Sequence, residues 1–464
     1  MIRAEFDTIA RIISAVRSEG RLSGVSFTGV SIDSRTIREG NLFVAVAGKS
    51  EDGHRFIPDA IKRGAAGIIA KADYEYDPGE KGVVFFAVED TLEALLKLAA
   101  WWLSRFELKK IAVTGTNGKT TTKEMIAAIL SRLHSVYRSP GNFNNLFGIP
   151  LSIFEMEGSY DFAVFEFGMS TTGEIARLTR IVQPQYGLIT NIDAAHLETM
   201  LSVDAIAAAK FELFDNMPSD GTVFINLDND YLRRRFDTER HEKYGFGVHS
   251  RTGFSPDRFE INGSGCARFE LESIGEVHLA MPGLHSLYNA IGAAAVAHYL
   301  KIPGREIKAA LESFRSVEMR METFTVAGVL IINDSYNANP NSMKYALDTL
   351  ESINARGRKF AVLGDMFELG VTESELHRQV GAHAAKSGPD FLITCGDRAR
   401  DISAAAVEMG YPSDATKHFA NVNDVTEHLL ARLHSGDAVL IKASRGMAFD
   451  RITTGLQSQL GRSN

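Results

Sequence analysis

The chain has 464 residues, 45% of them hydrophobic and 23% charged, with a formal net charge of -8. Because single hydrophobic cores stop growing at ~250–300 residues, we expect about three domains. The acidic balance argues against nucleic acid or anionic lipid as a general partner. Two cysteines are too few for a disulfide framework or a zinc cluster. No apolar run reaches the ~18 residues of a membrane span, so we expect a cytoplasmic protein.

The pattern of apolar and polar residues predicts an α/β protein of three domains. Residues 1–106 mix short strands with helices and form a small N-terminal α/β domain, with strands predicted over 42–46, 67–70 and 83–88 and helices over 57–63 and 91–106. Residues 107–316 alternate strand and helix, which predicts a central, P-loop-type doubly wound sheet, with strands over 109–113, 162–167, 187–191 and 221–226. An antiparallel section over 244–279 and helices over 286–300 and 305–314 end this region.

Residues 317–464 alternate again, which predicts a C-terminal, Rossmann-like domain. Its strands are expected over 329–333, 360–363, 391–395 and 438–442. Polar residues follow three of these strands, at 334–340, 363–370 and 442–446. Since ligands of such sheets bind beyond the carboxyl ends of the strands, we expect the three loops to share one cleft. For 334–340, a helix N-cap with its turn is an equally good interpretation.

The most informative segment joins the strand at 109–113 to a helix predicted over 123–133. It reads Gly115, Thr116, Asn117, Gly118, Lys119, Thr120 and Thr121. Backbone N–H groups of such a turn point at phosphate oxygens, and the helix dipole favours negative charge there. Lys119 would neutralise terminal phosphates and Thr120 would hold Mg²⁺. The common P-loop spacing requires glycine where Val113 stands, so this loop is a shortened variant that is predicted to bind ATP or GTP.

Three further residues are candidates for the functional site, and each also has a purely structural interpretation. Glu166 ends an apolar strand, where a carboxylate is costly unless it is ion-paired or ligates a metal such as Mg²⁺. His196 follows the strand at 187–191 within a polar loop, yet a lone histidine is more often a surface or satisfied core residue. Lys210 lies in a helix with an apolar face, and the pattern alone predicts that its ammonium extends to water.

These motifs together resemble the Mur ligases of peptidoglycan synthesis and their relative folylpolyglutamate synthase, and the resemblance covers the whole chain. The loop at 114–121 is common to the family. Other segments resemble the members that add D-alanyl-D-alanine; they lie at 31–35, 52–56, 141–145, 148–151, 334–340 and 363–370. The resemblance implies an ATP-dependent amide ligase that joins D-alanyl-D-alanine to UDP-N-acetylmuramoyl-tripeptide through an acyl phosphate. It leaves the third amino acid of the tripeptide open.

The resemblance also assigns roles to residues. It implies that Lys119, Lys210 and His196 are catalytic, and that Lys210 is carbamylated and binds metal. Thr120 and Glu166 would ligate one Mg²⁺ and His196 a second. Contacts with ATP would come from the phosphate loop together with Asn289 at adenine, Arg320 at the γ-phosphate and Asp334 at the ribose. The UDP-sugar substrate would face Ser34, Arg35, Asn144 and Asn145.

Three positions depart from the family, which usually has glycine where Asp193, Leu201 and Met319 stand. We expect Asp193 to add charge beside the metal site. We expect the turn around Leu201 to differ from the family, since leucine resists a positive φ. The alternatives are a sister ligase that adds a single amino acid, folylpolyglutamate synthase included, and a nucleotide-dependent switch without ligase activity. Nothing in the chain demands more than a monomer.

Overall fold

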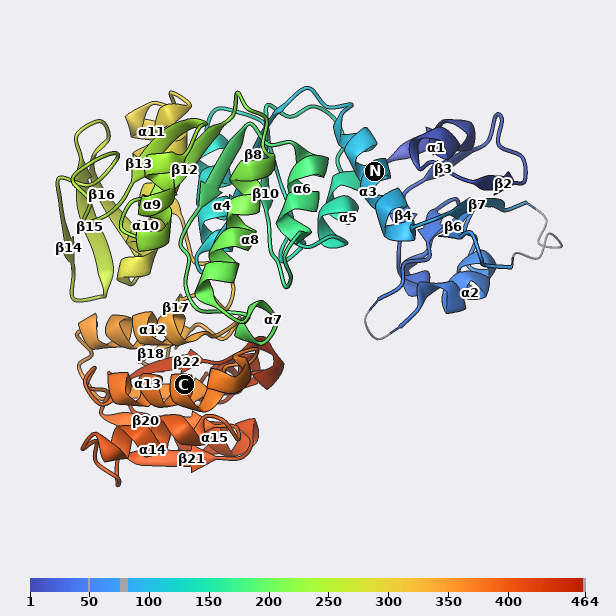
Figure 1. Ribbon diagram of the computed structural model, residues 1–464. Helices are drawn as coiled ribbons and strands as arrows, with labels where there is room; N and C mark the ends of the chain where they lie inside the picture. Colours follow the sequence, from blue (N-terminus) through green and yellow to red (C-terminus); the bar gives the residue numbers. More distant parts are fainter. Residues whose placement is uncertain (49–50, 76–81, 462–464) are drawn as a thin grey trace.

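The computed structural model describes residues 1–48, 51–75 and 82–461. Three α/β domains follow one another along the chain, and the N-terminal one lies apart from the C-terminal one, with the central domain between them (Figure 1). Within the described ranges, no helix is long and apolar enough to cross a membrane. The predicted three-domain α/β class is confirmed, whereas the boundaries at residues 107 and 317 stay a prediction.

The N-terminal domain has a five-stranded sheet of order β2-β7-β6-β5-β4 and a separate antiparallel pair, β1 with β3. β4 to β7 are parallel, and β2 joins β7 antiparallel. Its elements are β1 (Arg3–Glu5), α1 (Phe6–Ile12), β2 (Arg17–Glu19), β3 (Ser26–Thr28), β4 (Val30–Ser31), η1 (Ser34–Thr36), β5 (Leu42–Val44), η2 (Gly53–Phe56), α2 (Ile57–Lys62), β6 (Gly67–Lys71), β7 (Val84–Val88) and α3 (Thr91–Leu103).

The central domain is built on a parallel six-stranded sheet of order β13-β12-β11-β8-β10-β9. Its elements are β8 (Lys109–Thr114), α4 (Lys119–Leu130), β9 (Val136–Arg138), α5 (Gly148–Phe154), β10 (Phe162–Glu166), α6 (Glu174–Val182), β11 (Tyr186–Ile189), α7 (Leu197–Met200), α8 (Val203–Asn216), β12 (Thr222–Asn226), α9 (Asp230–Thr238) and β13 (Glu242–Phe246). The first strand, β8, lies between β10 and β11. The strands that follow it along the chain are added first on the β10 side (β9 and β10) and then on the β11 side (β11 to β13), so the strand order reverses at β8. That switch point is where α/β sheets bind ligands.

A three-stranded antiparallel sheet, β14 (Arg258–Ile261), β15 (Cys266–Leu271) and β16 (Gly275–Pro282), follows, and α10 (Leu284–Tyr299) and α11 (Gly304–Ser313) complete the central domain. Two sequence predictions were wrong in detail. Tyr244 belongs to the parallel strand β13, not to the antiparallel section. The helix predicted from residue 123 begins at Lys119, because Gly118 adopts a left-handed φ of 78° and the helix starts directly after it.

The C-terminal domain has a second six-stranded sheet, of order β17-β18-β22-β19-β20-β21, in which only the edge strand β17 is antiparallel. The predicted doubly wound domain is thus confirmed. Its elements are β17 (Glu322–Val326), β18 (Val329–Asn333), α12 (Pro340–Ser352), β19 (Lys359–Gly364), η3 (Gly370–Thr372), α13 (Glu373–Ala384), β20 (Phe391–Cys395), α14 (Arg400–Glu408), β21 (Thr416–Phe419), α15 (Val422–Leu430), β22 (Ala438–Lys442), η4 (Arg445–Met447) and α16 (Asp450–Leu460).

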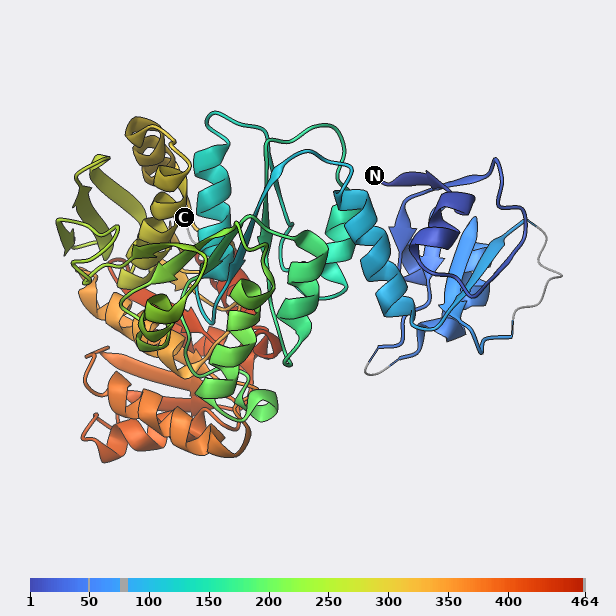
Figure 2. The same ribbon diagram turned by 45° about the horizontal axis from the view of Figure 1, so that its top comes forward.

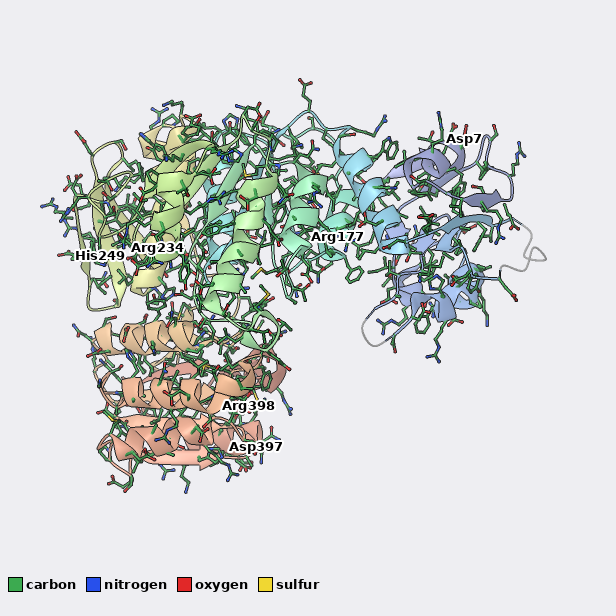
Figure 3. All side chains as sticks on the ribbon, viewed as in Figure 1. Asp7, Arg177, Arg234, His249, Asp397 and Arg398 are labelled. Carbon is green, nitrogen blue, oxygen red and sulfur yellow. The ribbon has the colours of Figure 1, made fainter. Side chains whose placement is uncertain are left out.

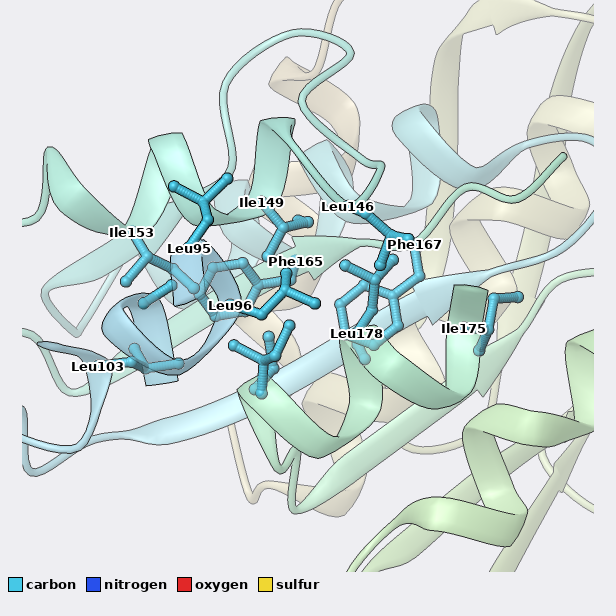
Figure 4. Packing of buried hydrophobic residues seen from close by; sticks show 14 of the residues in the cluster. Leu95, Leu96, Leu103, Leu146, Ile149, Ile153, Phe165, Phe167, Ile175 and Leu178 are labelled. Carbon is cyan, nitrogen blue, oxygen red and sulfur yellow. The ribbon is translucent and has the colours of Figure 1, made fainter. Parts of the chain in front are cut away.

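Helix α3 joins the N-terminal domain to the central one (Figure 2). Its side chains Leu95, Leu96 and Leu103 pack in one hydrophobic cluster with residues of α5, β10 and α6 (Figure 4). Burying each leucine contributes about 1.5–3 kcal/mol. Arg177 of α6, labelled in Figure 3, adds an ion pair of 2.5 Å with Glu93 of α3. The first two domains therefore share a hydrophobic core.

Candidate functional site

The phosphate loop after β8 is held in shape by the neighbouring strand end. The backbone N–H of Thr116 donates to the carbonyl of Asn191 at 3.0 Å, and that of Asn117 donates to the Asn191 side chain at 2.9 Å. Gly118 has no room for a side chain, because a Cβ there would lie 2.1 Å from Oδ1 of Asn289 on α10. The loop and the start of α4 thus have the strand–turn–helix geometry of an anion-binding turn, and the binding itself stays a prediction.

Cationic and donor groups gather at this loop, and neither Lys119 nor Arg320 forms an ion pair with another described residue. Lys119 Nζ donates to the carbonyls of Gly115 and Thr116, both at 3.0 Å. Burial lowers the pKa of Lys119, and Glu166 opposes that shift. The Arg320 guanidinium lies 3.9 Å from the centroid of the Tyr336 ring.

Two buried donors at the loop have no partner within the described part of the chain, Arg320 Nε and Asn117 Nδ2. A buried donor without a hydrogen bond costs about 1–3 kcal/mol. Oxygens of a bound anion would satisfy such donors, and Lys119 lies in the same cavity.

Glu166, the last residue of β10, is 1% exposed. Its two carboxylate oxygens accept hydrogen bonds, one from Thr120 Oγ1 at 2.7 Å and one from Asn144 Nδ2 at 2.8 Å. Its hydrogen-bond partners are thus a hydroxyl and an amide, and within the described ranges it lies in no ion pair, although its charge acts on Lys119. A hydroxyl and a carboxylate side by side next to a phosphate loop are a donor set that suits a hard cation such as Mg²⁺.

Lys210 on α8 is 3% exposed, so the prediction from its pattern alone, an ammonium that extends to water, is wrong. Burial lowers the pKa of Lys210 well below its ordinary value, an effect that Lys119 reinforces and Asp193 opposes. Within the described ranges Lys210 forms no hydrogen bond or ion pair. Neighbouring elements therefore cover the helix at this position, and burial favours the uncharged form of the amine.

His196 lies at the boundary between the central and C-terminal domains. Its Nδ1 is 2.5 Å from Oε2 of Glu368, in the loop after β19. The carbonyl of Glu368 also accepts the backbone N–H of Glu198 at 3.1 Å. The polar loop after β11 is therefore held against the C-terminal domain.

The loops of the C-terminal domain only partly confirm the shared cleft. Lys442 Nζ donates to Asp334 Oδ2 at 2.5 Å and to the Asn337 carbonyl at 2.9 Å, and all three residues line the main cavity. The loop at 363–370 does not line it. Asp365 accepts the backbone N–H of Ala399 at the start of α14 instead, at 2.7 Å. That prediction was wrong for this loop because the Asp365 carboxylate stabilises α14 of its own domain.

The main cavity has a volume of about 420 Å³ and lies between the central and C-terminal domains. Predicted residues that line it are Thr116, Asn117, Gly118, Lys119, Thr121, Asn144, Asn145, Glu166, His196, Lys210, Asn289, Arg320 and Asp334. Thr120 does not line the cavity itself, but its hydroxyl donates to Glu166, which does. Ser34 and Arg35 lie in η1 of the N-terminal domain, outside this cavity. There Arg35 pairs with Asp33 at 2.7 Å. The individual roles remain predictions.

Sequence reasoning missed several aromatic residues of the cavity wall, His285 and Tyr345 among them. The rings of His285 and Tyr345 are stacked with centroids 6.5 Å apart, and both line the cavity. Burial lowers the pKa of His285, and its Nδ1 has no partner among the described residues. His285 precedes Asn289 by four residues on α10, so the one-turn spacing was a usable signal. No sequence signal marked Tyr345.

At two of the three positions where the family usually has glycine, the backbone of this chain has a positive, left-handed φ. Leu201 has a φ of 63° and Met319 a φ of 57°. The expectation that the turn around Leu201 must differ from a glycine turn was therefore wrong. The Leu201 side chain is 82% exposed, so its Cβ meets no packed neighbour, and its N–H bonds the Leu197 carbonyl at 3.0 Å to end α7. The conformational cost of about 1–2 kcal/mol is tolerated there.

Fold and site together define a nucleotide-phosphate-binding α/β protein whose cavity is completed by a second doubly wound domain. Three family models match the chain: "Mur ligase family, catalytic domain" over residues 26–101, "Mur ligase middle domain" over 113–297, and "Mur ligase, glutamate ligase domain" over 319–445. The chain belongs to the Mur ligase family.

Curated relatives match over nearly the whole chain. The UDP-N-acetylmuramoyl-tripeptide--D-alanyl-D-alanine ligase of Bacillus subtilis is 32% identical over 458 residues, which cover 98% of this chain and 99% of the relative. The enzyme of that name from Escherichia coli is 31% identical, with coverage of 97% and 98%.

Solved structures of the same family resemble this chain over nearly its whole length. MurF from Acinetobacter baumannii superposes with a TM-score of 0.88 at 27% identity, covering 99% of both chains. MurF ligase from Thermotoga maritima, in complex with ADP, has a TM-score of 0.83 at 29% identity and covers 94% of this chain and 99% of that one.

Proposed function

We propose that the protein is an ATP-dependent amide ligase that joins D-alanyl-D-alanine to UDP-N-acetylmuramoyl-tripeptide, giving ADP, phosphate and the pentapeptide. The observation that carries the proposal is a single cavity. In it the phosphate loop, the carboxylate of Glu166 and the buried amine of Lys210 meet strand-end loops of the C-terminal domain. Relatives of that name match the chain from end to end. We further propose that the protein acts in the cytoplasm as a monomer.

The chemistry starts from a poor electrophile. The terminal carboxylate of the tripeptide takes the γ-phosphate to become an acyl phosphate, the dipeptide amine attacks the carbonyl carbon, and a tetrahedral intermediate expels phosphate. Two anions must approach each other in the first step. Lys119, hydrogen-bonded to its own loop, and Arg320, whose Nε has no partner in the described part of the chain, are the cations that would offset that repulsion.

The residues at the loop fit a divalent cation. Thr120 and Glu166 would hold one Mg²⁺, and His196 with carbamylated Lys210 a second. Bound there, such ions supply a positive charge that polarises phosphate oxygens. The lowered pKa of Lys210 favours the neutral amine, which is the form that adds carbon dioxide to give a carbamate.

The cavity wall suggests places for the rest of the nucleotide. We assign adenine to the neighbourhood of Asn289, which lies against the phosphate loop, and the ribose to Asp334, which Lys442 holds in place. The UDP-sugar is assigned to the surface that carries Ser34 and Arg35, with Asn144 and Asn145 on the side of the central domain.

The test is phosphate release from ATP and Mg²⁺ with UDP-N-acetylmuramoyl-tripeptide, with and without D-alanyl-D-alanine. Release that needs both substrates supports the proposal. Release with a single amino acid in place of the dipeptide makes the protein a sister ligase, and nucleotide binding without turnover on any acceptor makes it a switch.

A further inference from the structure

The loop between β11 and α7 holds a carboxylate that the proposed chemistry does not use. The backbone of Asp193 is tied to the phosphate loop, since Thr116 Oγ1 accepts the N–H of Asp193 at 3.0 Å and donates to its carbonyl at 3.2 Å. Its side chain accepts a hydrogen bond from Asn341 Nδ2 of the C-terminal domain at 2.8 Å, and the Asn117 side chain of the phosphate loop also interacts with it. One residue thus touches both the phosphate loop and the C-terminal domain.

Asn341 is the second residue of α12, a helix of 13 residues whose first turn contains no acidic side chain of its own. Helix N-termini carry a partial positive charge and favour a carboxylate. Asp193 supplies that carboxylate from the central domain. Burial raises the pKa of Asp193 to about 6, and the hydrogen bond from Asn341 works against this shift. The contact with α12 therefore offsets part of the cost of holding the carboxylate at the boundary.

The facing ionisable group on the central domain is Lys210, whose pKa the charge of Asp193 raises. A neighbouring contact runs from Asn339 Nδ2 to Asn117 Oδ1 at 2.7 Å, so α12 also reaches the phosphate loop directly. Glycine, which the family resemblance predicts at position 193, could make only the backbone contacts. The hydrogen bond to Asn341 is an addition that depends on this side chain.

We propose that Asp193 is a positioning residue which docks the C-terminal domain onto the phosphate loop through Asn341, and so sets how readily the two domains close around the cavity. The proposal concerns a contact between two side chains of the protein itself. It can be tested even if the proposed ligase function fails, because the readout is domain closure and not turnover.

The experiment measures domain closure by single-molecule energy transfer in the full chain without substrates. Dyes are placed on the exposed positions Ser219 of the central domain and Ser413 of the C-terminal domain, each changed to cysteine. Cys266→Ser removes the partly exposed native thiol, while Cys395 is buried. Two populations, closed and open, give the closure ratio of each variant.

Asn341→Asp sets two carboxylates against each other and should lower the closed-to-open ratio roughly tenfold, the effect expected for losing one hydrogen bond to a charged group. The exchanged pair, Asp193→Asn with Asn341→Asp, restores one donor and one acceptor and should return the ratio to the wild-type value. The matched control is Asn423→Asp, since Asn423 is likewise the second residue of a helix, α15, away from the boundary. It should leave the ratio unchanged.

Two results would overturn the proposal. One is an unchanged ratio in Asn341→Asp. The other is an exchanged pair that stays as open as Asn341→Asp, because a merely structural disturbance at position 341 would not be repaired by a change at position 193. Circular dichroism and the thermal midpoint of each variant show that the compared proteins are folded.

Discussion

The close approach of Gly118 to Asn289 allows one prediction to be worked out in detail. Gly118→Ala adds a Cβ in a left-handed backbone, at φ 78°, and places it 2.1 Å from Asn289 Oδ1. The backbone conformation costs an alanine about 1–2 kcal/mol. Moving a packed neighbour away adds about 1–3 kcal/mol. The free energy of unfolding should therefore fall by about 2–5 kcal/mol.

The central domain contains a matched control for the backbone cost alone. Gly158 has a φ of 75°, and a Cβ there would meet nothing within 4 Å. Gly158→Ala should lose only the about 1–2 kcal/mol of the left-handed conformation. The difference between the two variants, about 1–3 kcal/mol, isolates the clash with Asn289.

The assay is urea unfolding followed by fluorescence, with ADP binding by calorimetry alongside. Gly118→Ala should bind ADP far more weakly than wild type, whereas Gly158→Ala should bind it normally. In the double variant Gly118→Ala with Asn289→Ala, the clash is gone, so the loss of stability should be smaller than the sum of the single losses. Equal losses for Gly118→Ala and Gly158→Ala would refute the assigned contact.

Three further predictions follow from the site and the core. Lys119→Ala should reduce ligation by roughly 100-fold or more, because one cation that offsets the approach of two anions is lost; ligation at the wild-type rate would contradict its role. Lys210→Ala should abolish turnover, and excess bicarbonate should not restore it, since no amine remains to form a carbamate. Although burial opposes the shift, hydrogen bonds from His241 and Arg235 hold the pKa of Glu239 at about 2, below its ordinary 4.5. This depressed pKa stabilises the fold by at most about 3 kcal/mol above pH ~4.5, a contribution lost as the pH falls toward ~2. Glu239→Gln should therefore lower the unfolding free energy at pH 7 and scarcely at pH 2.

Exposed residues supply the controls for these variants. Lys62→Ala should leave ligation unchanged, and Glu272→Gln should leave the unfolding free energy unchanged at both pH values, because both side chains are exposed. Unchanged turnover in Lys210→Ala would mean that its burial serves packing only. A Glu239→Gln variant as stable as wild type at pH 7 would show that the hydrogen bonds from Arg235 and His241 contribute no net stability.

The helices, the strands and the phosphate loop could be predicted from the order of residues along the chain. Alternating apolar strands and helices predicted both doubly wound sheets, because that periodicity is a local property of the chain. The loop from Gly115 to Thr121 was recognised for the same reason, since a strand, two glycines, a lysine and a helix start are contiguous. Glu166 was also found locally, as a carboxylate at the end of a strand that is otherwise apolar.

Which distant groups meet depends on how the elements and domains pack. The tertiary structure buried Lys210, which its own helix would have left in water, because neighbouring elements cover that face. It left the loop at 363–370 outside the cavity, since Asp365 stabilises α14 of its own domain. It also brought Asp193 to Asn341, 148 residues along the chain, and Glu368 to His196. Such contacts depend on how whole domains pack, and no local pattern of residues encodes that.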